Sequence, residues 1–459
     1  MKVDQKSPWY DDLHKRRSKV HDLLAGSDHM RKKGEIYLPR HPKEDPISYD
    51  QRCQMTFLVN FVKQAVLTFT SRPFSEPVNV DGADLPKEIQ ENIDKQGNDL
   101  HVFAYRAFEQ MVADGIVFFY AAYPRLPEGS SRAEARARGA RPYLVTYTAD
   151  QLIAARFDDE TESPAMVKIV ETILEPDGEY GEEEVEQLRV FHRNRTELFR
   201  KREGENGKKE WQLHDEWPNR LGYIPIYAGY TNRLAAFQAL PPVEDIADLN
   251  IAHYQSLSDL RHILHVAQVP ILFRAGFNDD EGEMTAGPNT MVTTGNPDAN
   301  MKWVEINGPG IEQGRKHIGE IEGSIRLMSW ELLTRPARDR ETATARVIDQ
   351  EESQSALKAW ALSFSNAIEN AIRAMMEMDG QKWEGTVTLR GNFEIRRDPE
   401  ALRYLHEAYS LGAITKRTYV EELRRHDVLD STKPIEDQEG DLDGRASDRN
   451  NPGTGDEPA

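Results

Sequence analysis

Apolar residues recur at helical spacing over residues 241–267, PPVEDIADLNIAHYQSLSDLRHILHVA. They fall three, four or eight positions apart, so they share one face of a helix. Pro242 suits a first helical turn, where its missing N–H costs nothing, and Pro270 follows the end of the run. The spacing therefore predicts one long amphipathic helix.

Residues 309–333 carry a second pattern, in which apolar positions alternate in steps of three and four. This heptad-like spacing is typical of a helix that packs along one continuous groove. Its three glycines each cost about 1 kcal/mol relative to alanine, so we expect a reason such as close backbone approach or bending. An ordinary helical hairpin in a core remains an alternative. The predicted seam is Ile311, Gly314, Ile318, Ile321, Ile325, Met328 and Leu332.

Between these two helices, residues 268–308 alternate polar and apolar positions. The runs PILFRAG and NMKWVEI predict two strands, and TMVTT fits a third. After the second helix, Pro336 forces a break, and a third long helix begins near Glu341. The basic side chains around this break are Arg335, Arg338, Arg340 and Arg346.

The first half of the chain predicts an α+β domain of helices and an antiparallel sheet. Helices are expected over Trp9–Leu24, followed by a loop, over Arg52–Phe69, and along LHVFAYRAFEQMVAD, which Gly115 ends. GIVFFYAAYP reads as a fully buried strand. From Pro142 to Tyr230 several strand-like runs follow, separated by acidic turns at residues 158–163 and 176–184.

The last part of the chain changes character twice. GTVTLRGNFEIR predicts a strand or hairpin, and residues 397–429 predict two helices around Gly412 with Thr415 as the cap of the second. Reading of DNA by these helices is not expected, because the second mixes Glu421 and Glu422 with its basic residues. Residues 430–459 are acidic and nearly free of large apolar side chains, so we expect them to be disordered.

Composition limits the function classes. The 459 residues include 58 Lys and Arg against 78 Asp and Glu, which gives a net charge of −20. Proteins that grip nucleic acid tightly are usually basic, so we do not expect a sequence-specific DNA binder. No apolar run approaches the roughly 18 residues of a membrane span, and no apolar signal core opens the chain. The single cysteine, Cys53, excludes an intramolecular disulfide framework and is interpreted as an inert helix position.

Asp259, His262 and His265 form the one cluster whose spacing could ligate a metal from a helix. We interpret them as solvated or interface side chains, because no glutamate-flanked peptidase pattern accompanies them. No phosphate-binding loop, nucleotide-fold glycine pattern or serine elbow is present. We therefore predict no catalytic residues, no metal and no cofactor, with a soluble enzyme using His262 and His265 as a remote alternative.

The order of helix, β-rich excursion, return helix, basic loop and long third helix resembles tailed-bacteriophage portal proteins. Three segments carry the resemblance: IYLPRHPKED, PPVEDIADLNIAHYQSLSDL and ETATARVIDQEESQSALKAW. The similarity covers roughly Ile36 to Leu429, and it is closest to a branch described only as phage-encoded proteins of unknown function.

The resemblance implies the α+β portal architecture: an α/β wing, long antiparallel stem helices, a small β-rich clip and a helical crown. The implied parts are a polar N-terminal arm (1–35), the wing (36–240), stem helix 1 (241–267), the clip (268–308), stem helix 2 (309–333), the tunnel loop (334–341), a long helix and wing strand (342–396), the crown (397–429) and a disordered acidic tail (430–459).

By the same resemblance the chain forms a homo-oligomeric ring, a dodecamer, at one vertex of a virion capsid, after assembly in the host cytoplasm. In that ring the apolar seam, which is expected to have no partner elsewhere in the chain, packs against neighbouring subunits. Double-stranded DNA passes through it without sequence reading during packaging and ejection. The wing is expected to meet the major capsid protein and the scaffold, and the clip to dock the terminase large subunit and then the head–tail adaptor. The implied docking residues of the clip are Arg274, Phe277, Met301 and Trp303.

The arginines at the basic break have two interpretations. They could cap helices and pair with Glu331, Glu341 and Asp349. The resemblance instead places them in the tunnel loop, on the channel lumen near DNA phosphates, where a ring repeats each weak contact. A different minor capsid or connector protein is the main alternative for the whole chain.

Overall fold

Strand β2 (Ile116–Ala122) is buried along its whole length, as its uninterrupted apolar sequence predicts. It lies between β3 (Tyr143–Tyr147) and β9 (Ile226–Tyr230), both antiparallel to it, in a three-stranded sheet. Helices α6 (Leu100–Asp114) and α10 (Ala343–Met378) pack against β2. The predicted strand and the helix before it are confirmed.

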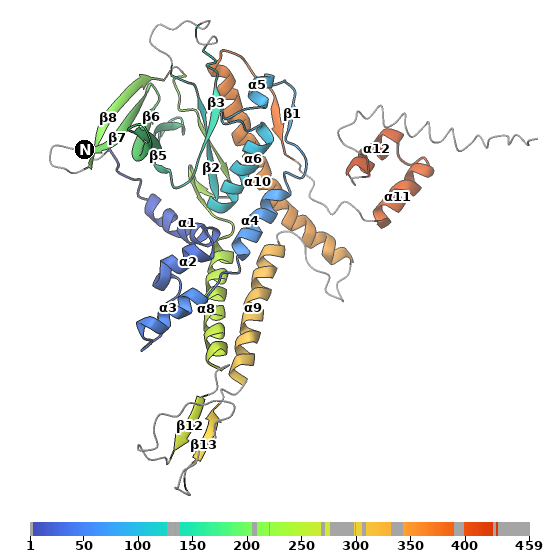
Figure 1. The fold of residues 1–459 in the computed structure, drawn as a ribbon. Coiled ribbons are helices and arrows are strands. Elements are labelled where there is room, and N and C mark those ends of the chain that lie inside the picture. Colours follow the sequence, from blue (N-terminus) through green and yellow to red (C-terminus); the bar gives the residue numbers. More distant parts are fainter. Residues whose placement is uncertain are drawn as a thin grey trace, which may run out of the picture. The chain divides into compact units, whose positions relative to one another are not determined.

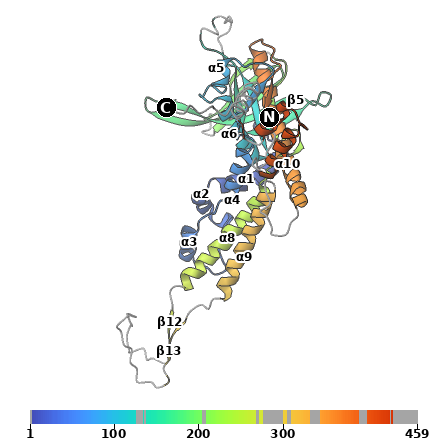
Figure 2. The ribbon, with the colours of Figure 1, turned by 90° about the vertical axis from the view of Figure 1, so that its right-hand side faces the viewer.

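The coordinates come from a computed structural model of the full chain (Figures 1 and 2). The chain divides into two units, Met1–Arg390 and Gly391–Ala459, and each is described by itself. The structure describes residues 3–125, 134, 138–203, 209–219, 221–267, 271–275, 298, 300–304, 309–331, 343–389, 399–425 and 428–429.

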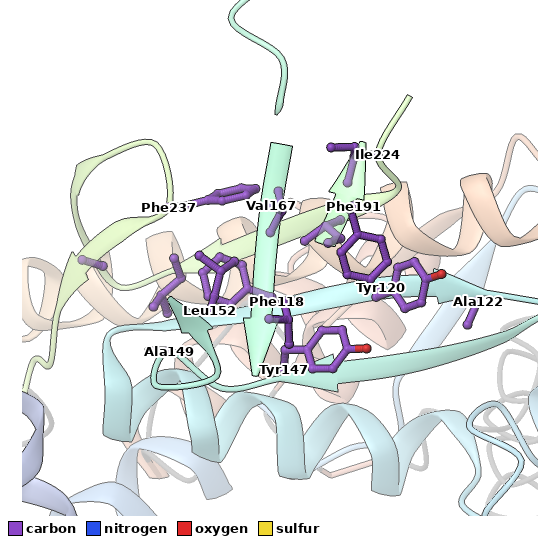
Figure 3. Close-up of a cluster of buried hydrophobic side chains, with 14 residues drawn as sticks. Phe118, Tyr120, Ala122, Tyr147, Ala149, Leu152, Val167, Phe191, Ile224 and Phe237 are labelled. Carbon is purple, nitrogen blue, oxygen red and sulfur yellow. The ribbon is translucent and has the colours of Figure 1, made fainter. Parts of the chain in front are cut away.

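A second, five-stranded antiparallel sheet has the order β4–β5–β6–β7–β8. One face packs on the three-stranded sheet, and the two share a core in which Phe118, Tyr120, Phe191 and Phe237 meet (Figure 3). The α+β class is therefore as predicted. The strands are β4 (Leu152–Phe157), β5 (Pro164–Asp177), β6 (Gly181–His192), β7 (Arg195–Glu203) and β8 (Lys209–Pro218).

Two details of this sheet differ from the prediction. The acidic segment 176–184 is mostly strand, because β5 and β6 pair as far as Asp177 and Gly181 and leave only residues 178–180 in the turn. Strand β8 was not predicted, because its charged residues disguise the alternation of a strand that lies at the sheet edge.

The N-terminal helices also differ from the prediction. One helix was expected over Arg52–Phe69, but the chain forms α3 (Pro46–Met55) and α4 (Phe61–Ser71) with an extended break between them. Asn60 caps α4 through Lys63 N, and Thr56 adopts an extended conformation at the end of α3. The expected loop after α1 (Tyr10–Leu24) instead contains α2 (Ser27–Lys33) and the short helix η1 (Gly34–Ile36).

Two long helices, α8 (Glu244–Ala267) and α9 (Pro309–Glu331), lie side by side and run in opposite directions (Figures 1 and 2). Between them in the sequence, β12 (Ile271–Ala275) and β13 (Asn300–Val304) form an antiparallel pair. The observed helix bounds lie within a few residues of the predicted ones.

Short elements complete the first unit. They are β1 (Asn79–Asp81), which pairs with β14 (Thr386–Thr388), β10 (Asn232–Ala235), which pairs with β11 (Gln238–Leu240), and α5 (Lys87–Gln90).

The second unit contains α11 (Pro399–Ser410) and α12 (Lys416–Arg425). Gly412 has a φ of +71° in the turn, and Thr415 Oγ1 accepts a hydrogen bond from Thr418 N, as predicted for a cap. Tyr409 stacks on Tyr419 with ring centroids 4.3 Å apart. Within the described residues, no helix is long and apolar enough to cross a membrane.

Candidate functional site

The α8–α9 hairpin, with the β12–β13 pair at its turn, is the feature on which a function can be built. Helix α8 has α1, α3 and α4 beside it, while α9 has α8 as its main contact. Helix α8 is therefore the better covered of the two.

Asn250 joins α8 to the start of α4. Its side chain is fully buried, and its Oδ1 accepts hydrogen bonds from Phe61 N at 3.0 Å and Val62 N at 3.2 Å. Its Nδ2 donates to Val59 O at 2.9 Å. The first N–H groups of a helix lack partners inside that helix, so Asn250 supplies an acceptor that they need.

A buried arginine joins the segment IYLPRHPKED to α8. Arg52 is 1% exposed, and its Nε and Nη2 donate to the two carboxylate oxygens of Glu44, both at 2.8 Å. Nη2 also donates to Pro39 O at 2.9 Å, and Nη1 lies 3.7 Å from Asp259 of α8. The hydrogen bonds from Arg52 lower the pKa of Glu44 to about 2.

The contacts of Arg52 give the proline-rich segment a structural role and not a catalytic one. Pro39 O and the Glu44 carboxylate accept hydrogen bonds from one guanidinium, and Thr56 Oγ1 donates to Ser258 Oγ of α8 at 2.8 Å. His41 Nε2 lies 3.2 Å from Asp259 Oδ1 in the same region. The segment therefore holds α3 against α8.

The isoleucines of the predicted seam face α8 of the same chain. Ile318, Ile321 and Ile325 are buried, and a Cβ on Gly314 would lie 3.4 Å from Leu260 Cδ1, so this glycine permits close approach. We expected a seam with no partner in its own chain, and that expectation was wrong, because α8 covers it. Ile311 is half-buried, while Leu332 lies outside the described residues.

The outward side of α9 has a different composition. Leu327, which follows Gly319 and Gly323 at helical spacing, is 46% exposed. Met328, which follows Ile325 towards the end of the predicted seam, is 42% exposed. No atom outside the helix lies within 4 Å of a Cβ on Gly319 or Gly323, so these glycines do not serve contact with α8. This side of α9 is uncovered in the described part of the chain.

One polar contact links the two helices directly. His253 of α8 is 1% exposed, and its Nε2 lies 3.2 Å from Glu322 Oε1 of α9. The imidazole packs edge-on against Phe61 of α4 with centroids 5.1 Å apart. His253 thus lies where α4, α8 and α9 meet.

The structure describes only some of the remaining predicted site residues. In the β12–β13 pair, Arg274 lies opposite Met301 and Leu272 opposite Trp303 in the backbone register. Arg346 lies on α10. The predicted residues that fall outside the described part of the chain are Phe277, Arg335, Arg338 and Arg340.

The histidines considered for a metal do not converge on one point. Asp259 pairs with His41 and not with His262 or His265. His262 Nδ1 is buried and has no hydrogen-bond partner in the described structure. Across the described ranges, no group of three or more His, Cys, Asp or Glu side chains is arranged to hold a metal ion.

The sequence reasoning missed a second buried ionic cluster, beneath α1. Asp114 at the end of α6 is fully buried and receives hydrogen bonds from His21, from Gln110 Nε2 at 2.9 Å and from Ala149 N at 3.2 Å. The hydrogen bond to Asp114 raises the pKa of His21. Arg17, 2% exposed, lies 3.3 Å from Asp150. The basic run LHKRRSKV shows that this segment is positively charged. It does not show which of its basic side chains are buried.

Comparison with known proteins finds one family model that is similar to part of the chain. A family model named "Domain of unknown function (DUF4055)" matches residues 242–378, from the start of α8 to the end of α10. This is less than half of the chain. Among curated proteins, none matches the sequence.

Solved structures of virus-like particles are similar to the chain at low levels. A chain from the virion of a native gene transfer agent particle is 10% identical, with a TM-score of 0.41, and the match covers 85% of this chain and 98% of that one. Chains from the neck of an empty particle (10% identical, 85% and 95% covered, TM-score 0.40) and of a native particle (11%, 80% and 89%, 0.38) are also similar. Likeness at this level fixes neither family nor function.

Proposed function

We propose that this chain is a phage portal protein, which forms a homo-oligomeric ring at one capsid vertex and serves as the channel for DNA packaging and ejection. The observation that carries the proposal is the α8–α9 hairpin with a strand pair inserted at its turn, followed by the arginine-rich segment and α10. This is the stem, clip, stem and tunnel-loop order that the sequence motifs resemble.

The difference between α8, which several helices cover, and α9, which mainly contacts α8, supports a ring. Helix α8 is held to the wing by Asn250 and by the Arg52 cluster, so the hairpin has a defined direction. Helix α9 keeps exposed apolar side chains at Leu327 and Met328. In a ring, each subunit presents one patch to one neighbour and a different patch to the other, and large obligate interfaces cover such apolar side chains.

The proposal assigns a docking role to the strand pair β12–β13. Phe273 on β12 is 47% exposed. As the clip, this pair would meet the terminase large subunit during packaging and the head–tail adaptor afterwards. The wing would meet the major capsid protein and the scaffold.

The arginine-rich segment would lie on the channel lumen. Each arginine–phosphate contact is screened in salt, where the Debye length is about 8 Å, so DNA can slide while a ring of such contacts still holds it. The double variant Arg338→Glu and Arg340→Glu should impair packaging or retention of DNA and leave ring assembly intact. Packaged DNA of normal length and normal retention would refute this role.

Interruption of the gene in the producing phage tests the function itself. A portal is required for DNA entry, so the mutant should yield heads without DNA, and the gene supplied in trans should restore filled heads. DNA-filled heads in normal number would overturn the proposal. Filled heads that lack tails would instead identify a minor connector protein.

A further inference from the structure

The outer ends of β5 and β6 form an acidic arm, defined here as residues 172–186. At its tip Tyr180 is 93% exposed, and Leu174 on its side is 62% exposed. The carboxylates of the arm are Glu175, Asp177, Glu179, Glu182, Glu183, Glu184 and Glu186.

Negative charges face each other across the two strands of the arm. In the strand register Glu175 lies directly opposite Glu183, and like charges in that relation destabilise a strand pair. Arg200 pairs with Glu175 and Lys201 with Glu186, which neutralises the base of the arm. Among the described residues, Glu182 and the acids nearer the tip have no such partner. The arm is therefore a two-stranded ribbon with an uncompensated charge and exposed apolar side chains, which is marginally stable alone.

A hollow with cationic walls lies between α1, α4 and α6. It has a volume of about 380 Å³, in the lower part of the range of about 300–1,000 Å³ that is typical of pockets for small organic groups. Lys63 and Arg106 line it, and neither has an ion-pair partner in the described part of the chain. Val66 and Leu24 supply apolar walls, and Glu109 is its one acidic residue.

The arm and the hollow of one chain do not touch. Helix α1 supplies one wall of the hollow, but most of it is built from α4 and α6, which pack on each other, and α6 packs on β2. The arm extends from the five-stranded sheet. In Figure 1 that sheet and these two helices lie on opposite sides of β2. Two complementary patches on different sides of one subunit are what a head-to-tail ring contact requires.

We propose that the acidic arm of one copy docks in the α1–α4–α6 hollow of the neighbouring copy, with Tyr180 in the hollow and the glutamates beside Lys63 and Arg106. The proposal rests on the proposed ring. The partner is a second copy because the same chain carries the aromatic tip, the negative ribbon and the positive hollow, each without a partner of its own. The contact is electrostatic at its rim, so added salt should weaken it.

Disulfide trapping tests the contact. In a Cys53→Ala background, which removes the only native thiol, the full chain carries Tyr180→Cys together with Lys63→Cys. After mild oxidation we expect a ladder of covalent multimers on a non-reducing gel. The matched control pairs Tyr180→Cys with Lys87→Cys, on a lysine of α5 whose side chain is 86% exposed, and should stay monomeric on the gel.

A charge exchange gives a second readout. Glu182→Lys with Glu184→Lys should raise the concentration for half-assembly at least tenfold, and adding Lys63→Glu with Arg106→Glu should restore it. Rings in light scattering with no ladder, or with no response to the charge exchange, would overturn the arm contact and leave the ring intact. An unmodified chain that forms no rings, also after co-expression with the capsid and scaffold proteins, would refute the proposed function, and this contact with it.

Discussion

Replacement of Arg52 by methionine is the sharpest test of how the α8–α9 hairpin is held. Arg52 is 1% exposed and Glu44 is 7% exposed, and methionine fills much of the volume but offers no charge. The variant leaves a buried carboxylate without its partner, together with Pro39 O. Removal of one partner from a buried ion pair costs about 3–5 kcal/mol, so we expect at least about 3 kcal/mol of local stability to be lost.

Hydrogen exchange followed by mass spectrometry measures this loss in the assembled protein. A loss of about 3 kcal/mol should speed amide exchange about 100-fold in peptides that cover α3 and the adjoining part of α8, because every 1.4 kcal/mol is a factor of ten. Peptides from β2 should exchange as before.

Arg16→Met is the matched control. Arg16 makes a comparable two-point contact with Glu244 of α8, at 2.8 and 2.7 Å, but it is 40% exposed. Exposed pairs contribute roughly 0.2–1 kcal/mol, so this variant should speed exchange less than tenfold. Equal effects of Arg52→Met and Arg16→Met would refute the reasoning from burial.

Acid should reproduce part of the Arg52 effect. The pKa of Glu44 is lowered from 4.5 to about 2, so its contribution is present above pH 4.5 and is lost as the pH falls towards 2. The acid-induced rise in exchange around α3 should disappear in Glu44→Gln. A rise of the same size in that variant would assign the effect to other carboxylates.

Two further substitutions test contacts of α6 and of the residue that ends it. His21→Gln removes the charged partner of buried Asp114, which should cost about 2 kcal/mol of stability. Because the pKa of His21 is raised in the folded chain, this stabilisation is fully present below pH 6.5 and is lost as the pH rises through the folded pKa. Exchange in α1 at pH 6 and pH 9 checks this, and an equal effect at both would contradict it. Gly115→Ala should cost at least about 2 kcal/mol in thermal unfolding, because φ is +85° and the new Cβ would collide with Leu240 O. Gly97→Ala, at φ +90° with open space around it, is the control and should cost less; equal losses would refute the collision.

Segments with a regular apolar pattern could be predicted from the sequence. A helix that is buried on one face shows apolar residues at helical spacing, and a strand that is buried on both faces is apolar throughout. The apolar faces of α8 and α9 and the fully apolar run of β2 gave their elements within a few residues. The break between α3 and α4 could not, since both halves carry helical spacing. The break depends on the cap Asn60 and on Asn250 of α8, which reaches the start of α4 only in the folded chain.

Some parts of the candidate site could also be predicted from the sequence, and others could not. The hairpin and its inserted strand pair follow from spacing. The partner of the isoleucine seam does not, because a heptad pattern fits a helix of the same chain as well as one of a neighbour. The inward-facing Arg17 and Arg52 were also missed, since nothing in sequence distinguishes a buried arginine from the many solvated ones.

Electron microscopy of the purified full chain, with light-scattering mass on the same sample, tests the central claim most directly. The account predicts rings with a central hole and a mass many times 52.4 kDa, which also gives the subunit number. A species of 52.4 kDa alone, at every concentration and also after co-expression with the capsid and scaffold proteins, would contradict it.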